Sequence, residues 1–234
     1  MLAIYKREMR SYFTTPIGYE FAGIFLSLSA GVFCYTTLYS LSADTTLYFS
    51  VMLVAFVVLL PLLTMKTLSE ERKMRTEQLL LSAPVSLTGM VMAKFLAAFT
   101  VFFGCILLSS LNFIILYTHA RPNTAVILGN LLALILVGMA FLAIGIFVSS
   151  LTESQLAASV ITVAVLVLLM IISFANSLIS LPWLRFLLSG LSVFSRFQNF
   201  ANGIFDVAAL VYYLSLAAVF LFLTVRVYDR RRFA

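Results

Sequence analysis

Six long apolar runs, separated by short polar segments, set the pattern of this chain of 234 residues. They lie at about residues 17–41, 46–65, 95–117, 126–148, 156–175 and 207–227. Each run holds about 20 residues or more, which lets an α-helix cross a hydrocarbon core of about 30 Å. The pattern therefore predicts an all-α polytopic membrane protein with six transmembrane helices in a single domain over residues 1–234.

Residues 1–15, ahead of the first run, combine charged and apolar positions at helical spacing. Lys6, Arg7 and Arg10 share one arc of a helix, and Tyr12 belongs to the opposite, apolar arc. This arrangement predicts an interfacial amphipathic helix. Bases before an apolar run also occur in signal peptides, but the run at 17–41 is too long for a signal core, which favours a retained anchor.

The longest polar interruption is segment 66–90, where acidic and basic residues recur at helical spacing. Glu70 with Lys73, and Lys73 with Glu77, lie three or four residues apart, so each pair weakly supports a helix. Pro84 is expected to end that helix because its ring excludes helical geometry at the residue before it. We expect a short cytoplasmic helix between two spans, and a solvated loop that only fixes topology is the alternative.

Composition and charge support the membrane class and set the orientation. The residues are 63% hydrophobic and 10% charged, far from the fractions typical of soluble domains. The formal net charge of +6 comes from bases that flank apolar runs, which argues against nucleic acid as a partner. A cytoplasmic N-terminus places twelve of the fifteen Lys and Arg residues inside, so we expect an inner-membrane protein with both termini cytoplasmic.

Two further features are predicted from smaller signals. Segment 177–206 is semi-apolar and interrupted by proline and glycine, which predicts one or two short extracytoplasmic helices. Small residues at a spacing of four indicate close helix packing, first at Gly23, Ser27 and Gly31 and more weakly at Gly145 and Ser149.

Catalytic and cofactor motifs are absent from the sequence. It contains no phosphate-binding loop, no zinc-protease motif and no nucleophile elbow, so we expect no catalytic residue, no metal and no bound cofactor. The ionisable residues lie near the ends of the spans, which argues against ion-coupled transport within the chain. Two rival functions stay open: an enzyme acting on lipid through Asn199, Asn202 and Asp206, and a carrier or channel without an ATPase.

Four stretches together resemble the ABC-2 type permease family, most closely the branch of gliding-motility permeases and the copper-maturation permease of nitrous oxide reductase. They are KREMRSYFTTPIGY at 6–19, SEERK at 69–73 with TEQLLLSAPVS at 76–86 and Lys94, SSLTESQ at 149–155, and FQNFANGIFD at 197–206. Arg75 stands where the family commonly has glycine.

The resemblance implies the membrane-spanning permease subunit of an ATP-driven exporter, which is not itself an enzyme. It implies a separate ATP-binding subunit that holds the ATP, a second copy of this chain or a related permease, contact with membrane lipid, and in some cases an extracytoplasmic auxiliary protein. A permease that transmits mechanical force to such a partner, without moving a solute, is the main alternative.

The resemblance also implies roles for two segments. Residues 1–15 would be the family's elbow helix, with Lys6, Arg7, Arg10 and Tyr12 as its characteristic residues. Segment 66–90 would be the coupling helix that touches the ATPase subunit. The implied contact residues are Glu70, Glu71, Arg72, Lys73, Thr76, Glu77, Gln78, Leu79, Leu80 and Leu81.

Overall fold

The computed structural model describes residues 1–74, 86–120, 122–178, 190, 192–201, 203 and 205–232, and nearly all of these are helical. The helices are α1 (Leu2–Thr14), α2 (Pro16–Phe33), the π-helix η1 (Cys34–Tyr39), α3 (Thr46–Lys73), α5 (Leu87–Ser109), α6 (Asn112–His119), α7 (Thr124–Leu151), α8 (Gln155–Leu178), α10 (Val193–Ala201) and α11 (Val207–Arg232). Within these residues six helical stretches are long and apolar enough to cross a membrane. The predicted all-α fold with six spans is therefore confirmed.

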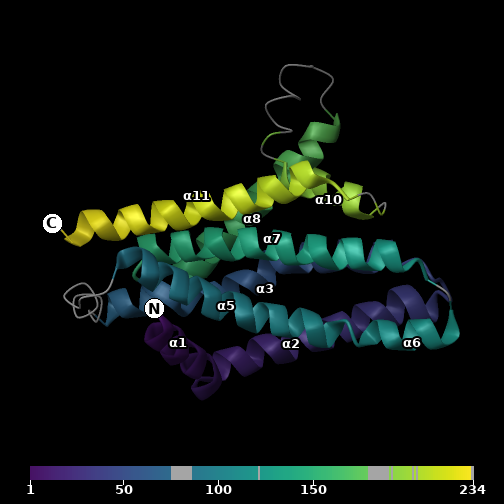
Figure 1. Cartoon of the computed structure of the whole chain (residues 1–234), viewed down its shortest axis with the longest axis horizontal. Coiled ribbons are helices and arrows are strands. Elements are labelled where there is room, and N and C mark those ends of the chain that lie inside the picture. Colours follow the sequence, from purple (N-terminus) through teal and green to yellow (C-terminus); the bar gives the residue numbers. More distant parts are fainter. Residues whose placement is uncertain are drawn as a thin grey trace.

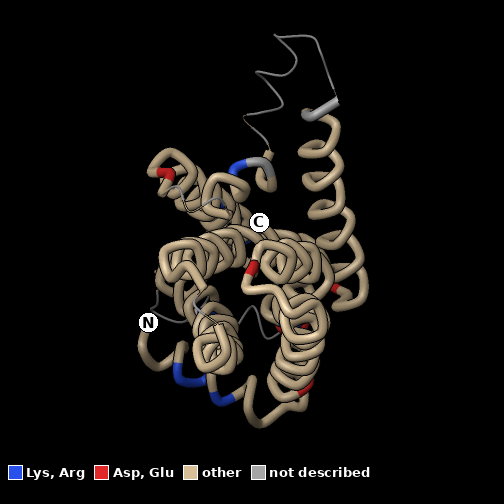
Figure 2. The backbone as a smooth tube through the Cα atoms, turned by 90° about the vertical axis from the view of Figure 1, so that its right-hand side faces the viewer, with Lys and Arg blue, Asp and Glu red and all other residues tan. Residues whose placement is uncertain are grey.

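The long helices run side by side around α7, which is the most buried of the six candidate spans (Figure 1). Helix α7 packs against α3, α5, α8, α10 and α11. Both chain ends lie at the end of the bundle where α3 finishes and α5 starts (Figure 1). Seen along the bundle, most of the chain is neither acidic nor basic, and the C-terminal part of α8 leans away from the other helices (Figure 2).

A sharp bend separates the amphipathic helix α1 from the first span, α2. Thr15 is extended, as expected for a residue before proline, and Pro16 then starts α2 at a position where a missing N–H costs nothing. Gly18 lets α2 pack closely on α1, because a Cβ there would lie 2.3 Å from the Tyr12 carbonyl oxygen. The sequence at this bend thus holds α1 at an angle to the span.

Helix α3 continues beyond the predicted run 46–65 and ends at Lys73. The residues from Lys66 to Lys73 are therefore the last turns of a span helix, not a separate helix between two spans. Glu70 pairs with Lys66 at 3.2 Å, where the sequence analysis expected Lys73 as its partner. The rest of the predicted coupling segment, residues 75–85, lies outside the described residues.

The two small-residue patterns have different surroundings in the folded chain. A Cβ at Gly145 of α7 would lie 2.2 Å from Thr64 Oγ1 of α3, so this glycine allows two spans to touch. At Gly23 and Gly31 of α2 an added Cβ meets nothing within 4 Å. In segment 177–206 the structure describes one short helix, α10, and residues 179–189 lie outside the described part.

Candidate functional site: a buried charged cluster joining α1, α3 and α5

Lys94, in the second turn of α5, is only 1% exposed although its side chain carries a charge. Its Nζ lies 3.0 Å from Glu8 Oε1 of α1, 2.8 Å from Glu71 Oε1 of α3 and 2.9 Å from the carbonyl oxygen of Thr67. An ammonium group has three N–H donors, so these three acceptors satisfy it fully. One lysine thus joins three helices that are far apart in sequence.

Arg7 closes the cluster on its solvent side. Its Nη2 lies 3.1 Å from Glu8 Oε1 and 2.9 Å from Glu71 Oε1, and its side chain is about half exposed. Burial lowers the pKa of Arg7, but hydrogen bonds and the charges of the two carboxylates outweigh this and raise it overall. We call Arg7, Glu8, Glu71 and Lys94 the charged cluster; its two bases balance its two acids.

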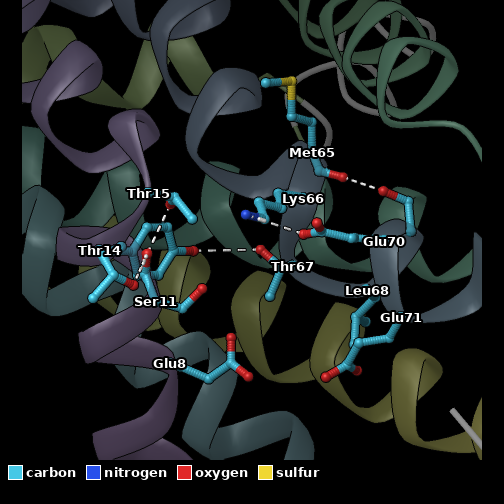
Figure 3. Close-up of polar contacts among 12 residues, drawn as sticks. Glu8, Ser11, Thr14, Thr15, Met65, Lys66, Thr67, Leu68, Glu70 and Glu71 are labelled. Carbon is cyan, nitrogen blue, oxygen red and sulfur yellow. Dashed lines mark hydrogen bonds and ion pairs between the residues drawn. The ribbon is translucent and has the colours of Figure 1, made fainter. Parts of the chain in front are cut away.

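Tyr12 makes a second link between α1 and α3. Its hydroxyl donates to the Leu63 carbonyl oxygen at 3.2 Å. It also lies 3.5 Å from Oγ1 of Thr67, a contact that Figure 3 draws as a dashed line. Burial raises the pKa of Tyr12, so the hydroxyl keeps its proton and remains a donor. Figure 3 also shows Glu8 of α1 and Glu71 of α3 at the boundary between these two helices.

Helix α7 binds the same end of α3 through the hydroxyl group of one serine. Ser149 Oγ accepts from the backbone N–H groups of Leu68 and Ser69, at 3.2 and 3.1 Å, and donates to the Met65 carbonyl oxygen at 3.2 Å. Arg72 binds the end of α7 as well: its guanidinium donates to the carbonyl oxygen of Leu151, the last residue of α7, at 2.6 Å and pairs with Glu153, two residues further on, at 3.0 Å. The end of α3 is therefore tied to α1, α5 and α7.

The residues that the sequence assigned to ATPase contact have different surroundings. Glu70 has 40% of its side chain exposed and Lys73 is exposed, so both can reach a partner. Glu71 has only 15% exposed and contacts Lys94 and Arg7 within the chain. The other predicted contacts, Thr76, Glu77, Gln78, Leu79, Leu80 and Leu81, lie outside the described residues.

The residues that the resemblance assigned to an elbow helix also differ in exposure. Lys6 and Arg10 are exposed, whereas Tyr12 is buried and Arg7 belongs to the charged cluster. Three residues at this site were not predicted as site residues: Glu8, Thr67 and Lys94. A usable signal existed for Lys94, because a lysine followed by an unbroken apolar run belongs to a span and needs a buried acidic partner.

At the other end of the bundle, two residues of the rival enzyme reading act as a helix cap. Asp206 Oδ1 accepts from the N–H groups of Ala208 and Ala209, and Asn199 donates to Asp206 Oδ2 at 2.7 Å. This bond from Asn199 is the main reason why the pKa of Asp206 is lowered. Asn202 lies outside the described residues, and among those described no three His, Cys, Asp or Glu side chains gather to hold a metal ion.

Comparison with known proteins agrees with the fold. A family model described as "ABC-2 type transporter" matches residues 1–205, which takes in the charged cluster and five of the six spans. No curated protein matches the chain. Since the match covers most of the sequence and the six spans accompany it, the chain belongs to the ABC-2 type transporter family as a multi-pass membrane protein.

Proposed function

We propose that this chain is the permease subunit of an ATP-driven exporter and that a separate ATP-binding subunit acts on the end of α3. The single observation that carries the proposal is the charged cluster, in which Lys94 joins α3 to α1 and α5. The family generally supplies the non-catalytic membrane part of a transporter that works with an ATP-binding partner in a dimeric arrangement. Inner-membrane location with cytoplasmic termini belongs to the same proposal.

The contacts of α3 suggest how a push would spread. Glu70 and Lys73 are available at the surface, while Glu71, one residue from Glu70, is held by Lys94 and Arg7. A displacement of the outer residues therefore moves Glu71, and with it α1 and α5. In this scheme the three helices move together, because Lys94 holds the carboxylates of α1 and α3 through short charge-assisted hydrogen bonds.

Pro61 supplies a place where α3 can bend in response. It lies inside the helix and cannot donate an N–H to the carbonyl four residues earlier, so one bond of the ladder is absent. The charged cluster lies on the Lys73 side of this point. We infer that the segment from Thr64 to Lys73 tilts as a unit while the other half of α3 keeps its packing.

The alternative is a permease that passes this movement to an extracytoplasmic protein without moving a solute. The same contacts serve either task, because both need motion at one end of α3 to reach the other side of the membrane. Membership of the gliding-motility and copper-maturation branch, and pairing with a second identical chain, are further parts of the proposal. They rest on the motifs at 6–19, 69–86, 149–155 and 197–206.

The test is to co-express the tagged chain with the genes beside its own and measure the mass and ATPase activity of the purified assembly. We expect two permease chains with two ATP-hydrolysing subunits. The charge reversals Glu70→Lys and Lys73→Glu, introduced together, should leave membrane insertion intact and weaken ATPase binding at least tenfold. Glu20→Lys, an exposed charge reversal on α2, is the matched control.

Two results would refute the proposal. The first is a chain that purifies without any ATP-hydrolysing partner. The second is a double variant that binds the ATPase subunit as tightly as the Glu20→Lys control. To separate export from force transmission, the purified assembly in liposomes is tested for nucleotide-dependent binding of an extracytoplasmic partner in the absence of any transported solute.

A further inference from the structure

An apolar groove of about 630 Å³ lies on the outside of the bundle, between α5 and α11. These helices flank α7, whose residue Met139 also lines the groove (Figure 1). Val91 and Phe95 of α5 form one wall, and Leu221 of α11 belongs to the other. Ala218 of α11 also lines the groove, and its small side chain leaves space there that a larger side chain would fill. The groove is therefore shaped for a slender apolar group.

The length of the groove matches one leaflet of a bilayer. Its apolar lining on α11 runs from Leu214 to Val225. At about 1.5 Å per residue this stretch is roughly 17 Å long. One leaflet is half of a hydrocarbon core of about 30 Å, which gives about 15 Å. A lipid acyl chain lying along α11 would fill the groove from headgroup level to about mid-bilayer.

Polar groups line the groove only at the end where both chain termini lie. They are Thr88 of α5 and Arg226 and Asp229 of α11. Arg226 Nη1 is 3.6 Å from Asp229 Oδ2, a long ion pair whose two side chains are 62% and 42% exposed. The backbone N–H groups of Leu87 and Thr88, at the start of the 23-residue helix α5, find no acceptor among the residues that the structure describes. They add a partial positive charge at the same mouth.

We propose that this groove binds one phospholipid with a phosphoethanolamine headgroup, taken from the leaflet at the charged end of the bundle. The acyl chain lies between α5 and α11, and the phosphate contacts Arg226 and the N–H groups at the start of α5. The ammonium group of the lipid contacts Asp229. A headgroup with one anion beside one cation matches a mouth with one guanidinium and one carboxylate, whereas a purely anionic headgroup would face Asp229 unfavourably.

The test is native mass spectrometry of the full chain, released from nanodiscs that contain phosphatidylethanolamine and phosphatidylglycerol in equal amounts. We expect one phosphatidylethanolamine to stay bound per chain as the collision energy is raised. Arg226→Gln removes a charge-assisted hydrogen bond and should reduce the retained lipid about tenfold. Ala218→Phe should block the acyl chain and abolish retention.

Matched controls decide between this site and ordinary lipid around the protein. Arg230→Gln removes an exposed charge beside the groove, and Val219→Phe adds bulk to an α11 residue that is 53% exposed and does not line it. Both should retain lipid like the native chain. Equal loss in test and control variants would overturn the site, and so would equal retention in all of them. Retention of phosphatidylglycerol as strong as that of phosphatidylethanolamine would overturn the headgroup assignment. Arg226→Gln changes an exposed residue, so it still tests the site if Ala218→Phe fails to fold.

Discussion

Two buried polar clusters join α3 and α5 to a third helix, one at each end of the bundle, and they are built from different chemistry. At the end with the chain termini, the charged cluster links α3 and α5 to α1. At the other end, three hydroxyl groups link the same two helices to α2. Ser29 Oγ is 2.8 Å from Tyr48 OH and 2.6 Å from Ser109 Oγ, and the last two atoms are 2.8 Å apart. We call these three residues the hydroxyl cluster.

The difference follows from what each cluster loses when one member is removed. Each hydroxyl both donates and accepts, so any two members of the hydroxyl cluster still bond to each other if the third is lost. In the charged cluster, Lys94 and Arg7 each contact both acids, but Lys94 is 1% exposed and Arg7 is half exposed, so loss of Lys94 removes the buried base that holds Glu8 and Glu71 together. The charged end therefore depends mainly on one buried residue, Lys94, while the contacts at the other end are shared evenly among three hydroxyl groups.

This contrast bears on which end of α3 can serve as a switch. Breaking a charged contact in a partly buried site is costly unless water or a new partner replaces it. Arg7 is half exposed, so water or a partner protein can reach the charged cluster at this residue. The hydroxyl cluster has Ser29 and Tyr48 almost completely buried, so it is suited to hold the helices together during any movement.

The largest effect should come from Lys94→Met, which keeps the length of the side chain and removes its charge. Two carboxylates then lose their buried partner, and we expect the free energy of unfolding to fall by about 3–5 kcal/mol. The measurement is the unfolding equilibrium of the purified chain in mixed micelles, with SDS as denaturant. The expected order is that this variant is the least stable of all single changes discussed here.

A triple variant provides the control for Lys94→Met. Glu8→Gln and Glu71→Gln, added to Lys94→Met, remove the two negative charges that Lys94 balanced and should restore most of the lost stability. If the triple variant is no more stable than Lys94→Met alone, the cost comes from packing around Lys94 and not from the charges of Glu8 and Glu71.

A middle-sized effect is expected between the two clusters, where α3 touches α7 without any charge. Gly145→Ala would bring a methyl group to 2.2 Å from Thr64 Oγ1 and 2.9 Å from Thr64 Cβ, so α3 and α7 must separate. Overpacking of this kind costs about 1–3 kcal/mol. The same SDS titration measures this loss of stability. A loss well below that of Lys94→Met would show that the charged cluster is the stronger contact.

Gly23→Ala is the matched control for Gly145→Ala. Its Cβ would meet nothing within 4 Å, and alanine favours a helix over glycine by roughly 0.5–1 kcal/mol. We expect the isolated chain to be unchanged or slightly more stable. A loss of stability equal to that of Gly145→Ala would contradict the close approach of α7 and α3.

The sequence predicted features that depend on neighbouring residues. The six apolar runs and the amphipathic start follow from local spacing, and α1 and α2 form as that spacing indicates. It did not predict where α3 ends, because the stretch from Lys66 to Lys73 contains no helix breaker and Lys66 pairs with Glu70 along the helix. Polarity was taken as the end of the span, but the helix continued.

Contacts between distant residues could not be predicted from one sequence. Glu8 and Lys94 are 86 positions apart, and no pattern in either segment specifies that pairing. The same limit applies to the small-residue patterns: Gly23 and Gly145 carry similar local signals, yet one faces open space and the other touches Thr64. Predicting either outcome requires the arrangement of the helices.

The smallest effect should come from Tyr48→Phe, which removes one hydroxyl from the hydroxyl cluster and leaves the ring. The ring packs edge to face against Phe33, Phe49 and Phe113, so phenylalanine keeps these contacts. Ser29 and Ser109 remain bonded to each other, and a hydrogen bond between membrane helices contributes about 0.6 kcal/mol on average. The SDS titration should therefore show a loss of roughly that size.

Tyr35→Phe, which removes a hydroxyl from a side chain that is 71% exposed, should show no loss at all and serves as the control for Tyr48→Phe. The informative quantity is the loss in free energy of unfolding caused by Tyr48→Phe, compared with the loss caused by Lys94→Met. If loss of the tyrosine hydroxyl costs as much stability as loss of the lysine charge, the hydroxyl cluster is not redundant. A small Tyr48→Phe effect beside a large Lys94→Met effect places the sensitive point of the protein where α1, α3 and α5 meet.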